Sequence, residues 1–277
     1  MRIPFTKMSG AGNDFVVVDN RSGIINDAAN FAVTVCNRRL GIGADGLLLV
    51  ENHESSAFAM KYYNADGSNA GMCGNGGRCI AKFAYDNGIV STSVFIFEGF
   101  GHIYTVEHLN ATRYTLTMKT PHGYRKDQQL NINGEHLIAS YLNTGTDHSV
   151  IFLDDNNGLG HLASAEVFRI GRAVRYNDVY KPLGVNANFV ARIDAKSIQI
   201  RTYERGVEDE TLACGTGSVA SALLSSLKYG MTSPIKVKVQ SGEFLEIGFR
   251  SNGESFSEVT LTGNAVNTFN GEFEYQK

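Results

Sequence analysis

The sequence contains no tryptophan and, in 277 residues, only four prolines and four cysteines. The cysteines form no C-x-x-C pair, which argues against a zinc ribbon and against a thioredoxin-type redox site. No run of lysine or arginine occurs and the net charge is −3, so neither nucleic acid nor an anionic membrane is an expected partner.

Long apolar stretches are also missing. No segment approaches the roughly 18 apolar residues of a membrane-spanning helix, and residues 1–15 contain no apolar signal-peptide core. Membrane insertion and secretion are therefore not indicated, and the expected compartment is the cytoplasm. Because disulfides are rare in a reducing cytoplasm, a cysteine in an unusual setting there is more often reactive than structural.

Apolar runs between turn residues are present in two series, one in each half of the chain. They predict strands at 13–19, 46–51, 57–64, 93–98, 114–119, 149–155, 186–194, 197–204, 235–240 and 258–263. Helical periodicity predicts helices at 27–40, 76–87, 162–175 and 217–229. The second and fourth helices are expected to end at Gly88 and Gly230, because glycine readily adopts the left-handed conformation that closes a helix.

The two halves of the sequence align with each other. Three segments pair in order: 8–23 with 143–158, 43–50 with 184–191, and Cys73 with Cys214. A repeat of about 140 residues is too long for the repeating unit of a solenoid. It indicates two duplicated domains related by a pseudo-twofold axis.

The predicted fold class is therefore α/β (α+β), with two pseudosymmetric homologous domains. The N-terminal domain, carrying Cys73, is expected at 1–118 and is completed by a C-terminal strand at 264–277. The second domain, carrying Cys214, is expected at 119–263. The polar stretch at 120–136 is the expected connection.

Two cysteines stand in C-G-x-G loops directly before predicted helices. They are Cys73 in MCGNGGRC (72–79) and Cys214 in ACGTGSVA (213–220). The N–H groups and the dipole at a helix N-terminus favour negative charge, so the pKa of such a thiol falls below its ordinary value of about 8.5. The loop glycines let the backbone approach a ligand closely. Cys36 and Cys79 lack such a context and are interpreted as buried packing residues.

Duplicated domains place equivalent loops at their interface, where ligand clefts commonly form. If both loops face one cleft, their N–H groups can bind one carboxylate from two sides, with its α-carbon between the two sulfurs. That arrangement suits racemisation or epimerisation by two bases. One thiolate removes the α-proton, and the opposite thiol returns a proton to the other face while the carboxylate takes up the developing charge. No cofactor and no metal is expected.

Five motifs together resemble those of diaminopimelate epimerases: SGAGNDF (9–15), GIGADG (41–46), NADGS (64–68), MCGNGGRC and ERGVEDETLACGTG (204–217). The resemblance implies that each domain is a barrel-like, strand-rich sheet around a central helix. It also implies a cofactor-free isomerase that converts a small-molecule substrate, LL-2,6-diaminopimelate, to the meso form. That reaction belongs to lysine and peptidoglycan biosynthesis.

The resemblance also assigns roles to individual positions. The two catalytic bases correspond to Cys73 and Cys214. The loops that grip the reacting carboxylate correspond to Gly74, Asn75, Gly215 and Thr216. Further substrate-binding positions correspond to Asn13, Asn64, Asn186, Glu204 and Arg205, and an arginine can grip the distal carboxylate through two parallel hydrogen bonds. The residues that tune the cysteines correspond to His148 and Glu204.

The chain departs from the family pattern at two places. Thr146-Asp147-His148 stands where the family often has Asn-Pro-His, and Gly46 stands where some members carry a glutamine that touches substrate. We interpret both as lineage variation, because the chain retains the two cysteine loops and the residues that would bind the distal end of the substrate.

Two other functions stay open from the residues. A cysteine-pair racemase for proline, hydroxyproline or histidine would share Cys73 and Cys214 without needing Arg205. A non-enzymatic thiol protein, either redox sensor or metal binder, would use a Cys73–Cys214 disulfide or bind zinc stoichiometrically. The sequence also leaves open whether the chain forms a homodimer and which cysteine is the thiolate at rest.

Overall fold

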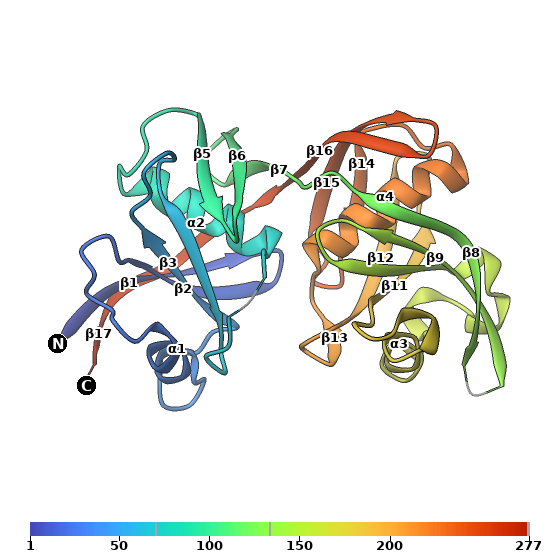
Figure 1. Ribbon diagram of the computed structural model, residues 1–277, viewed down its shortest axis with the longest axis horizontal. Coiled ribbons are helices and arrows are strands. Elements are labelled where there is room, and N and C mark those ends of the chain that lie inside the picture. The colour runs from blue at the N-terminus through green and yellow to red at the C-terminus, as the bar shows by residue number, and fades with distance from the viewer. Residues whose placement is uncertain (70, 133, 276–277) are drawn as a thin grey trace. The chain divides into compact units, whose positions relative to one another are not determined.

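The computed structural model describes residues 1–69, 71–132 and 134–275, and it divides into two compact units. Unit 1 comprises Met1–Thr117 together with Thr262–Lys277, and unit 2 comprises Met118–Leu261. Both units are strand-rich and carry helices (Figure 1), which confirms the predicted mixed α/β fold with two homologous parts.

Unit 1 holds two helices, α1 (Ala28–Cys36) and α2 (Gly74–Asp86). Its strands are β1 (Arg2–Gly10), β2 (Asn13–Asp19), β3 (Gly46–Glu51), β4 (Ala59–Asn64), β5 (Val94–Gly99), β6 (His102–His108), β7 (Arg113–Thr117) and β17 (Val266–Glu274). The chain returns to this unit through β16 (Ser255–Asn264), and β17 then pairs antiparallel with β1. The two ends of unit 1 therefore lie side by side, with the Met1 ammonium 2.6 Å from the Tyr275 oxygen.

Unit 2 holds α3 (Val167–Arg175) and α4 (Gly215–Tyr229), and four short 3-10 helices at Leu153–Asp155, Asn157–Leu159, Leu162–Ser164 and Asp178–Tyr180. Its strands, besides most of β16, are β8 (His122–Ile132), β9 (Glu135–Asn143), β10 (Asp147–Phe152), β11 (Asn186–Arg192), β12 (Ser197–Glu204), β13 (Asp209–Thr211), β14 (Ile235–Lys238) and β15 (Phe244–Asn252).

The order of strand pairing is the same in both units. In unit 1, β1–β2 is antiparallel, β2–β3 parallel, β3–β4 antiparallel, β4–β5 parallel and β5–β6 antiparallel. In unit 2, the strands β9, β10, β11, β12, β14 and β15 repeat that alternation pair by pair. The repeat seen in the sequence is thus a repeat of topology.

One helix of each unit is almost wholly buried. Eleven of the 13 residues of α2 and eleven of the 15 residues of α4 are buried among the strands of their own unit. Small residues make this possible: a side chain at Gly77 would come within 2.6 Å of Met72 and 2.8 Å of Leu116. The other two helices are amphipathic and cover the strands with one face, α1 through Phe31 and Val35 and α3 through Ile170 and Val174.

The predicted connection at 120–136 is wrong, because β8 spans most of it and pairs antiparallel with β9. Most β8 residues are exposed, so a strand with a polar composition resembles a loop in the sequence. Helix α1 is shorter than expected, and α3 begins at Val167 because Leu162–Ser164 forms a 3-10 turn. Helix α4 ends at Gly230, in the left-handed conformation that was predicted.

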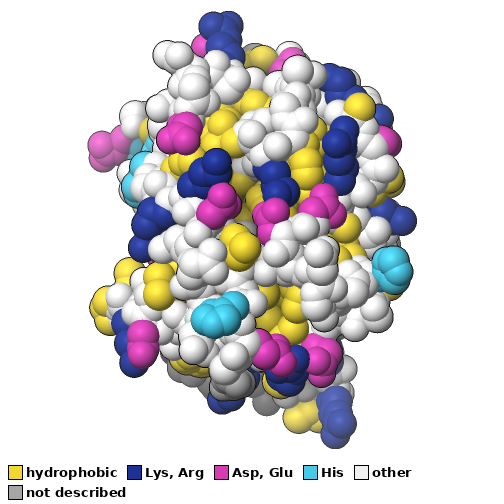
Figure 2. All heavy atoms as spheres, turned by 90° about the vertical axis from the view of Figure 1, so that its right-hand side faces the viewer, with side chains coloured by type: hydrophobic (Ala, Val, Ile, Leu, Met, Phe, Trp, Pro, Cys, Tyr) yellow, Lys and Arg dark blue, Asp and Glu magenta, His cyan; other side chains and the backbone are white. Residues whose placement is uncertain are grey.

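Cys36 and Cys79 are both buried inside unit 1, at 2% and 0% exposure, in agreement with a packing role. Burial raises the pKa of the Cys36 thiol to about 12. Among the described residues, no helix is long and apolar enough to cross a membrane. On the face drawn in Figure 2, lysine and arginine side chains alternate with aspartate and glutamate.

Candidate active site

Both candidate bases are N-cap residues of buried helices. Cys73 is the N-cap of α2 with φ −106° and ψ 117°, and Cys214 is the N-cap of α4 with φ −118° and ψ 111°. Cys214 is buried at 6% exposure and Cys73 is half-buried. The two loops therefore have nearly the same backbone conformation, each with its sulfur at a helix N-terminus.

The first turn of each helix is suited to bind an anion. The first intrahelical bonds run from Gly77 N to the Cys73 oxygen at 2.8 Å and from Ser218 N to the Cys214 oxygen at 2.9 Å. The N–H groups of residues 74–76 and 215–217 come before these bonds, where an α-helix offers donors without helical acceptors. These segments contain four of the residues assigned to the carboxylate grip.

In unit 1, a fixed pair of amides lies behind the Cys73 loop. Asn75 is fully buried, and its Oδ1 accepts from Arg78 Nη2 at 2.7 Å while its Nδ2 donates to Asn13 Oδ1 at 2.7 Å. A guanidinium can only donate, so the orientation of both amides is determined. Asn13 Nδ2 in turn donates to Asp45 Oδ2 at 3.0 Å. The structure thus brings Asn13 and Asn75 together.

Charged groups hold the start of β2 beside these amides. Asp14 accepts from Lys7 Nζ at 2.7 Å and from Arg38 Nη2 at 2.8 Å. Burial raises the pKa of the Asp14 carboxyl, but the bonds and charges of Arg38 and Lys7 outweigh it and bring that pKa down to about 2. The Arg38 guanidinium also bonds Asp45 at 2.7 Å. The acceptor of the Asn13 amide is therefore itself held by a cation.

Asn64 lies at the end of β4, in a tight turn. Its Nδ2 donates to Ser68 Oγ at 3.0 Å, and its backbone oxygen accepts from Gly67 N at 2.9 Å, where Gly67 has φ +82°. Opposite Asn64 across the β3–β4 pair stands Gly46. A side chain at 46 would overlap the Tyr62 ring and come within 2.6 Å of the Tyr63 oxygen, so a glutamine there requires a rearranged β4.

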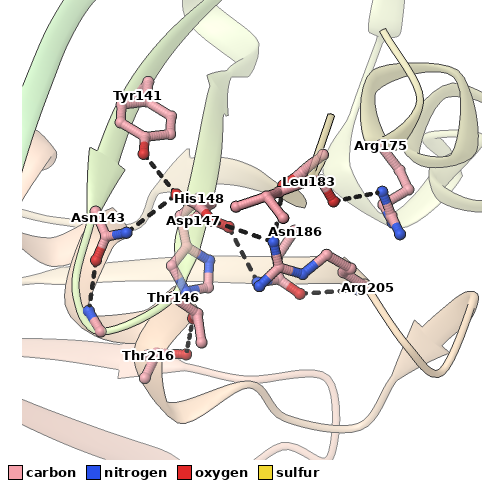
Figure 3. Close-up of polar contacts among 12 residues, drawn as sticks. Tyr141, Asn143, Thr146, Asp147, His148, Arg175, Leu183, Asn186, Arg205 and Thr216 are labelled. Atoms are coloured by element: carbon pink, nitrogen blue, oxygen red, sulfur yellow. Dashed lines mark hydrogen bonds and ion pairs between the residues drawn. The ribbon is translucent and has the colours of Figure 1, made fainter. Parts of the chain in front are cut away.

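In unit 2, the side chains of His148, Thr146 and Thr216 form a row (Figure 3), and Thr216 contacts Cys214. The Thr216 hydroxyl lies 3.6 Å from Cys214 Sγ, within the range of a bond to the large sulfur atom, and 3.1 Å from Thr146 Oγ1, which donates to it. Thr146 Oγ1 lies 2.9 Å from His148 Nε2. His148 is fully buried, and that burial lowers the pKa of its imidazole to about 3, so the ring is neutral near pH 7.

The distal-end candidates form a second cluster in unit 2. Arg205 Nη1 donates to Asp147 Oδ2 at 3.1 Å and to the Gly184 oxygen at 2.9 Å. Asn186 Oδ1 accepts from the Arg205 backbone N–H at 2.8 Å, and its Nδ2 donates to the Asp147 oxygen at 3.0 Å. The structure therefore brings Asn186 and Arg205 together, with Asp147 between them (Figure 3).

Asp147 is held on its other side as well. Its Oδ1 accepts from Tyr141 OH at 2.6 Å and from Asn143 Nδ2 at 3.0 Å. Burial raises the pKa of the Asp147 carboxyl, and the bonds from Tyr141, Asn143 and Arg205 outweigh it and lower that pKa overall. Glu204, the residue before Arg205, accepts from Thr211 Oγ1 at 2.9 Å.

Sequence reasoning missed several members of these clusters. Tyr141, Asn143 and Asn188, whose Nδ2 lies 3.1 Å from His148 Nδ1, were not singled out, because each lies within a predicted or actual strand and belongs to no motif. Thr146 and Asp147 were noticed as departures from a pattern, and the structure gives both of them defined partners.

Two pockets lie away from the cysteines. A pocket of about 590 Å³ in unit 1 is lined by Phe83, Asp86 and Asn87, at the end of α2 opposite Cys73. A smaller one of about 210 Å³ in unit 2 is lined by Arg125, Tyr141 and Asp147 among others. Among the described residues, no group of three or more His, Cys, Asp or Glu side chains is placed to hold a metal ion.

Comparison with known proteins gives one consistent result. The family model for diaminopimelate epimerase matches residues 5–122 and 140–268. The chain belongs to the diaminopimelate epimerase family. A diaminopimelate epimerase of Aquifex aeolicus is 39% identical over 279 residues, covering 96% of each chain, and one of Chlorobaculum tepidum is 41% identical, covering 95% of this chain and 98% of its own. Epimerases are isomerases, so the protein is an enzyme of that class.

The fold is shared more widely than the sequence. A phenazine biosynthesis protein of the PhzF family from Bacillus anthracis superposes with a TM-score of 0.74 at 12% identity, covering 99% of this chain and all of that one. This likeness concerns the fold, whereas membership of the diaminopimelate epimerase family rests on the sequence matches.

Proposed function

We propose that the protein converts LL-2,6-diaminopimelate to the meso isomer by a cofactor-independent, two-base mechanism in which Cys73 and Cys214 are the bases. The observation that carries this proposal is the equivalence of the two cysteines. Each is the N-cap of the buried helix of its own unit, in the same backbone conformation. A reaction that inverts one carbon needs two equivalent acid–base groups, and a duplicated domain supplies one from each half.

The proposed reaction conserves protons. The thiolate of one cysteine removes the α-proton and becomes a thiol, and the thiol of the other gives its proton to the opposite face of the carbon and becomes a thiolate. The reverse reaction exchanges the two roles. Between the steps, negative charge moves into the substrate carboxylate, where N–H groups of residues 74–76 and 215–217 would stabilise it.

The distal end of the substrate would be read by Arg205 and the amides assigned to binding. Arg205 is one quarter exposed, and its direction is fixed by Asp147 and by the Gly184 oxygen. A guanidinium held in this way can bind a planar carboxylate by donating hydrogen bonds to it, with little loss of side-chain entropy. In this proposal Asn13, Asn64, Asn186 and Glu204 contact the polar groups of the substrate, and His148 and Glu204 tune the cysteines.

The biological setting is part of the same proposal. The relatives are named diaminopimelate epimerases, and we propose that the meso-diaminopimelate made here serves lysine and peptidoglycan synthesis. Two catalytic thiols that must stay reduced would favour a cytoplasmic location. We also propose that residues 1–118 with 264–277 and residues 119–263 act as the two halves that each contribute one base.

The deciding experiment is exchange in D2O. Reduced, chelator-treated protein is incubated with LL-diaminopimelate, and α-deuterium incorporation is followed together with the meso isomer. Deuterium that appears together with meso product is the expected result. Lysine, which lacks the distal carboxylate, and proline are tested in parallel. Exchange on proline or lysine without exchange on diaminopimelate would replace this proposal with the cysteine-pair racemase.

A further inference from the structure

Strand β11 carries a buried polar residue that the reaction described above does not use. Asn188 is fully buried in the apolar segment NANFVAR, directly beside the row of side chains that ends at Cys214. A buried amide is costly unless all of its polar atoms are bonded, so its contacts define what it does there.

The orientation of the Asn188 amide follows from its neighbours. Its Nδ2 lies 3.1 Å from the Ser149 backbone oxygen, which can only accept, and its Oδ1 accepts from Thr202 Oγ1 at 3.0 Å. The opposite orientation would place two oxygens against each other. The second hydrogen of Nδ2 then faces His148 Nδ1 at 3.1 Å, the nearer of two remaining acceptors, since the Asn186 backbone oxygen lies at 3.4 Å.

That contact determines where the imidazole proton lies. A neutral imidazole has one donor and one acceptor nitrogen. Because Nδ1 accepts from Asn188, the proton of His148 is on Nε2, and Nε2 donates to Thr146 Oγ1 at 2.9 Å. Burial lowers the pKa of His148, so the ring does not take up a second proton near pH 7. One ring nitrogen therefore stays a donor and the other an acceptor.

The donor direction of the next two hydrogen bonds follows from the tautomer of His148. Thr146 accepts from His148 and therefore uses its own hydrogen toward Thr216 Oγ1, at 3.1 Å. Thr216 accepts that bond, and its own hydrogen is left for Cys214 Sγ, at 3.6 Å. Each hydroxyl has one hydrogen, so fixing the first donor fixes all the others.

We propose that Asn188 is a positioning residue that fixes the Nε2-protonated tautomer of His148 and so directs a chain of hydrogen-bond donors through Thr146 and Thr216 onto the sulfur of Cys214, which stabilises the thiolate of Cys214. The proposal rests on the proposed function only for the role of Cys214 as a base. On deprotonation, the thiol proton leaves to solvent, and Thr216 donates to the resulting anion.

Closeness of packing supports the same assignment. A side chain at Gly217 would overlap Asn188 Oδ1 and come within 3.2 Å of Cys214 Sγ. The first turn of α4 is therefore packed directly on both ends of the donor chain. The charged groups near His148 are Asp147 on its own strand and Arg205 after β12, which bond each other at 3.1 Å, and Glu204 on β12 accepts from Thr211.

The first test reads the tautomer directly. Protein labelled with nitrogen-15 in histidine is examined without substrate by long-range proton–nitrogen NMR, which distinguishes Nε2–H from Nδ1–H, with His148→Gln to assign the signal. An Nε2–H tautomer near pH 7 is expected for His148. A proton on Nδ1, or an imidazolium, would overturn the proposal. In Asn188→Leu, which keeps the volume but loses the donor, a mixture of tautomers is expected.

The second test measures the acidity of Cys214. The thiolate absorbance is titrated against pH without substrate, and the titration of Cys214→Ser is subtracted to isolate this thiol. Thr216→Val removes the last donor and is expected to lower the thiolate-to-thiol ratio at a given pH about tenfold, a shift of about one pH unit. Thr146→Val and Asn188→Leu are expected to shift the midpoint in the same direction by less.

Thr144→Val is the matched control. Thr144 is also a buried threonine and donates to the backbone oxygen of Thr216 at 3.0 Å, but it is not one of the hydrogen-bond donors that connect Asn188 with Cys214. Its loss is expected to leave the Cys214 midpoint unchanged. An unchanged midpoint in Thr216→Val, or an equal shift in Thr144→Val, would overturn the proposal, and both can be read even if Asn188→Leu does not fold. Neither test uses diaminopimelate, so failure of turnover on that substrate would count only against the proposed function.

Discussion

The two helix N-termini that carry the cysteines have the same backbone and different polar partners. At the position after the loop glycine, unit 1 has Asn75 and unit 2 has Thr216. Asn75 connects an amide, Asn13, with a buried guanidinium, Arg78, whereas Thr216 connects a hydroxyl with the sulfur of Cys214. Duplication thus preserved the helix and its N-cap, while the side chains around them diverged.

The difference extends to the next layer. Asn13 aligns with His148 in the repeat, so an amide that cannot titrate stands where the other unit has an imidazole. In unit 1 the amide is held by the carboxylates and cations of Asp45, Asp14 and Arg38. In unit 2 the imidazole is held by the neutral amide of Asn188. At this aligned position, unit 1 relies on an amide next to ion pairs and unit 2 on an imidazole next to a neutral amide.

The largest expected effect tests whether the halves are equal in the reaction. Cys73→Ser and Cys214→Ser should each lower the rate of epimerisation by about 10³-fold or more, because a hydroxyl is a far weaker acid–base group than a thiol. The measurement is meso product formed from LL-diaminopimelate in D2O. Cys79→Ser, a buried cysteine with no assigned role in the reaction, is the control for folding. A substantial rate in either of the first two variants would contradict a two-base mechanism.

The next effect concerns the distal cluster. The offset that relates Cys73 to Cys214 places Asn64, not an arginine, at the position of unit 1 that matches Arg205. Arg205→Met should lower kcat/KM for diaminopimelate by about 10²-fold, because a charged, bidentate contact is lost. Asp147→Asn keeps the guanidinium but weakens its positioning, so a smaller loss, mainly in KM, is expected. Steady-state kinetics of both variants would separate the roles, and equal losses would show that the two residues act as one unit.

Equivalent glycines offer a stability test of the same comparison. Gly76 and Gly217 occupy matching positions, but a Cβ at 217 would overlap Asn188, whereas a Cβ at 76 would make ordinary contacts of 3.4 Å with Leu48 and Met60. Gly217→Ala should lower the free energy of unfolding by about 1–3 kcal/mol through overpacking. Gly76→Ala should leave it unchanged or raise it by up to about 1 kcal/mol. Urea unfolding measures both, and similar values would mean that the two helices are packed alike.

The smallest effect comes from the ion pairs of unit 1. The folded-state pKa of Asp14 is about 2, below its ordinary 3.8, so Asp14 contributes stability above pH 4 that is lost as the pH falls toward 2. With allowance for solvent screening at the partly exposed Arg38, this contribution is about 1–2 kcal/mol. Asp14→Asn should remove that part of the acid dependence in unfolding experiments between pH 4 and 2. Asp178→Asn, at an exposed ion pair, should leave the acid dependence as it is.

Much of the fold could be predicted because its core strands are continuous apolar runs. The bounds of β2, β3 and β12 agree with the predicted segments residue for residue, and the helices that follow the cysteines begin within two residues of prediction. The strands that were missed, such as β8 and β15, have many exposed residues and owe their structure to pairing, whereas β17 lies within the expected strand at 264–277. Composition carries little information about a strand whose side chains mostly face water.

The site divides in the same way. Residues such as Asn13, Asn75 and Asn186 could be named from the sequence because the resemblance to the family assigns their positions one by one. Asn188 could not, because an asparagine inside an apolar strand has no local pattern that reveals a histidine 40 residues away in the chain. The direction of a hydrogen-bond chain depends on which atoms face each other, and that is a property of the folded chain only.

The pairing of β1 with β17 has a consequence for synthesis on the ribosome. Unit 2 is contained within one continuous segment, Met118–Leu261, and can fold as soon as that segment has emerged. Unit 1 cannot be completed then, because β17, a neighbour of β1, is made only after all of unit 2. The half that is translated first is therefore the half that finishes folding last, and until then β1 has an open edge that a chaperone or a second nascent chain can pair with.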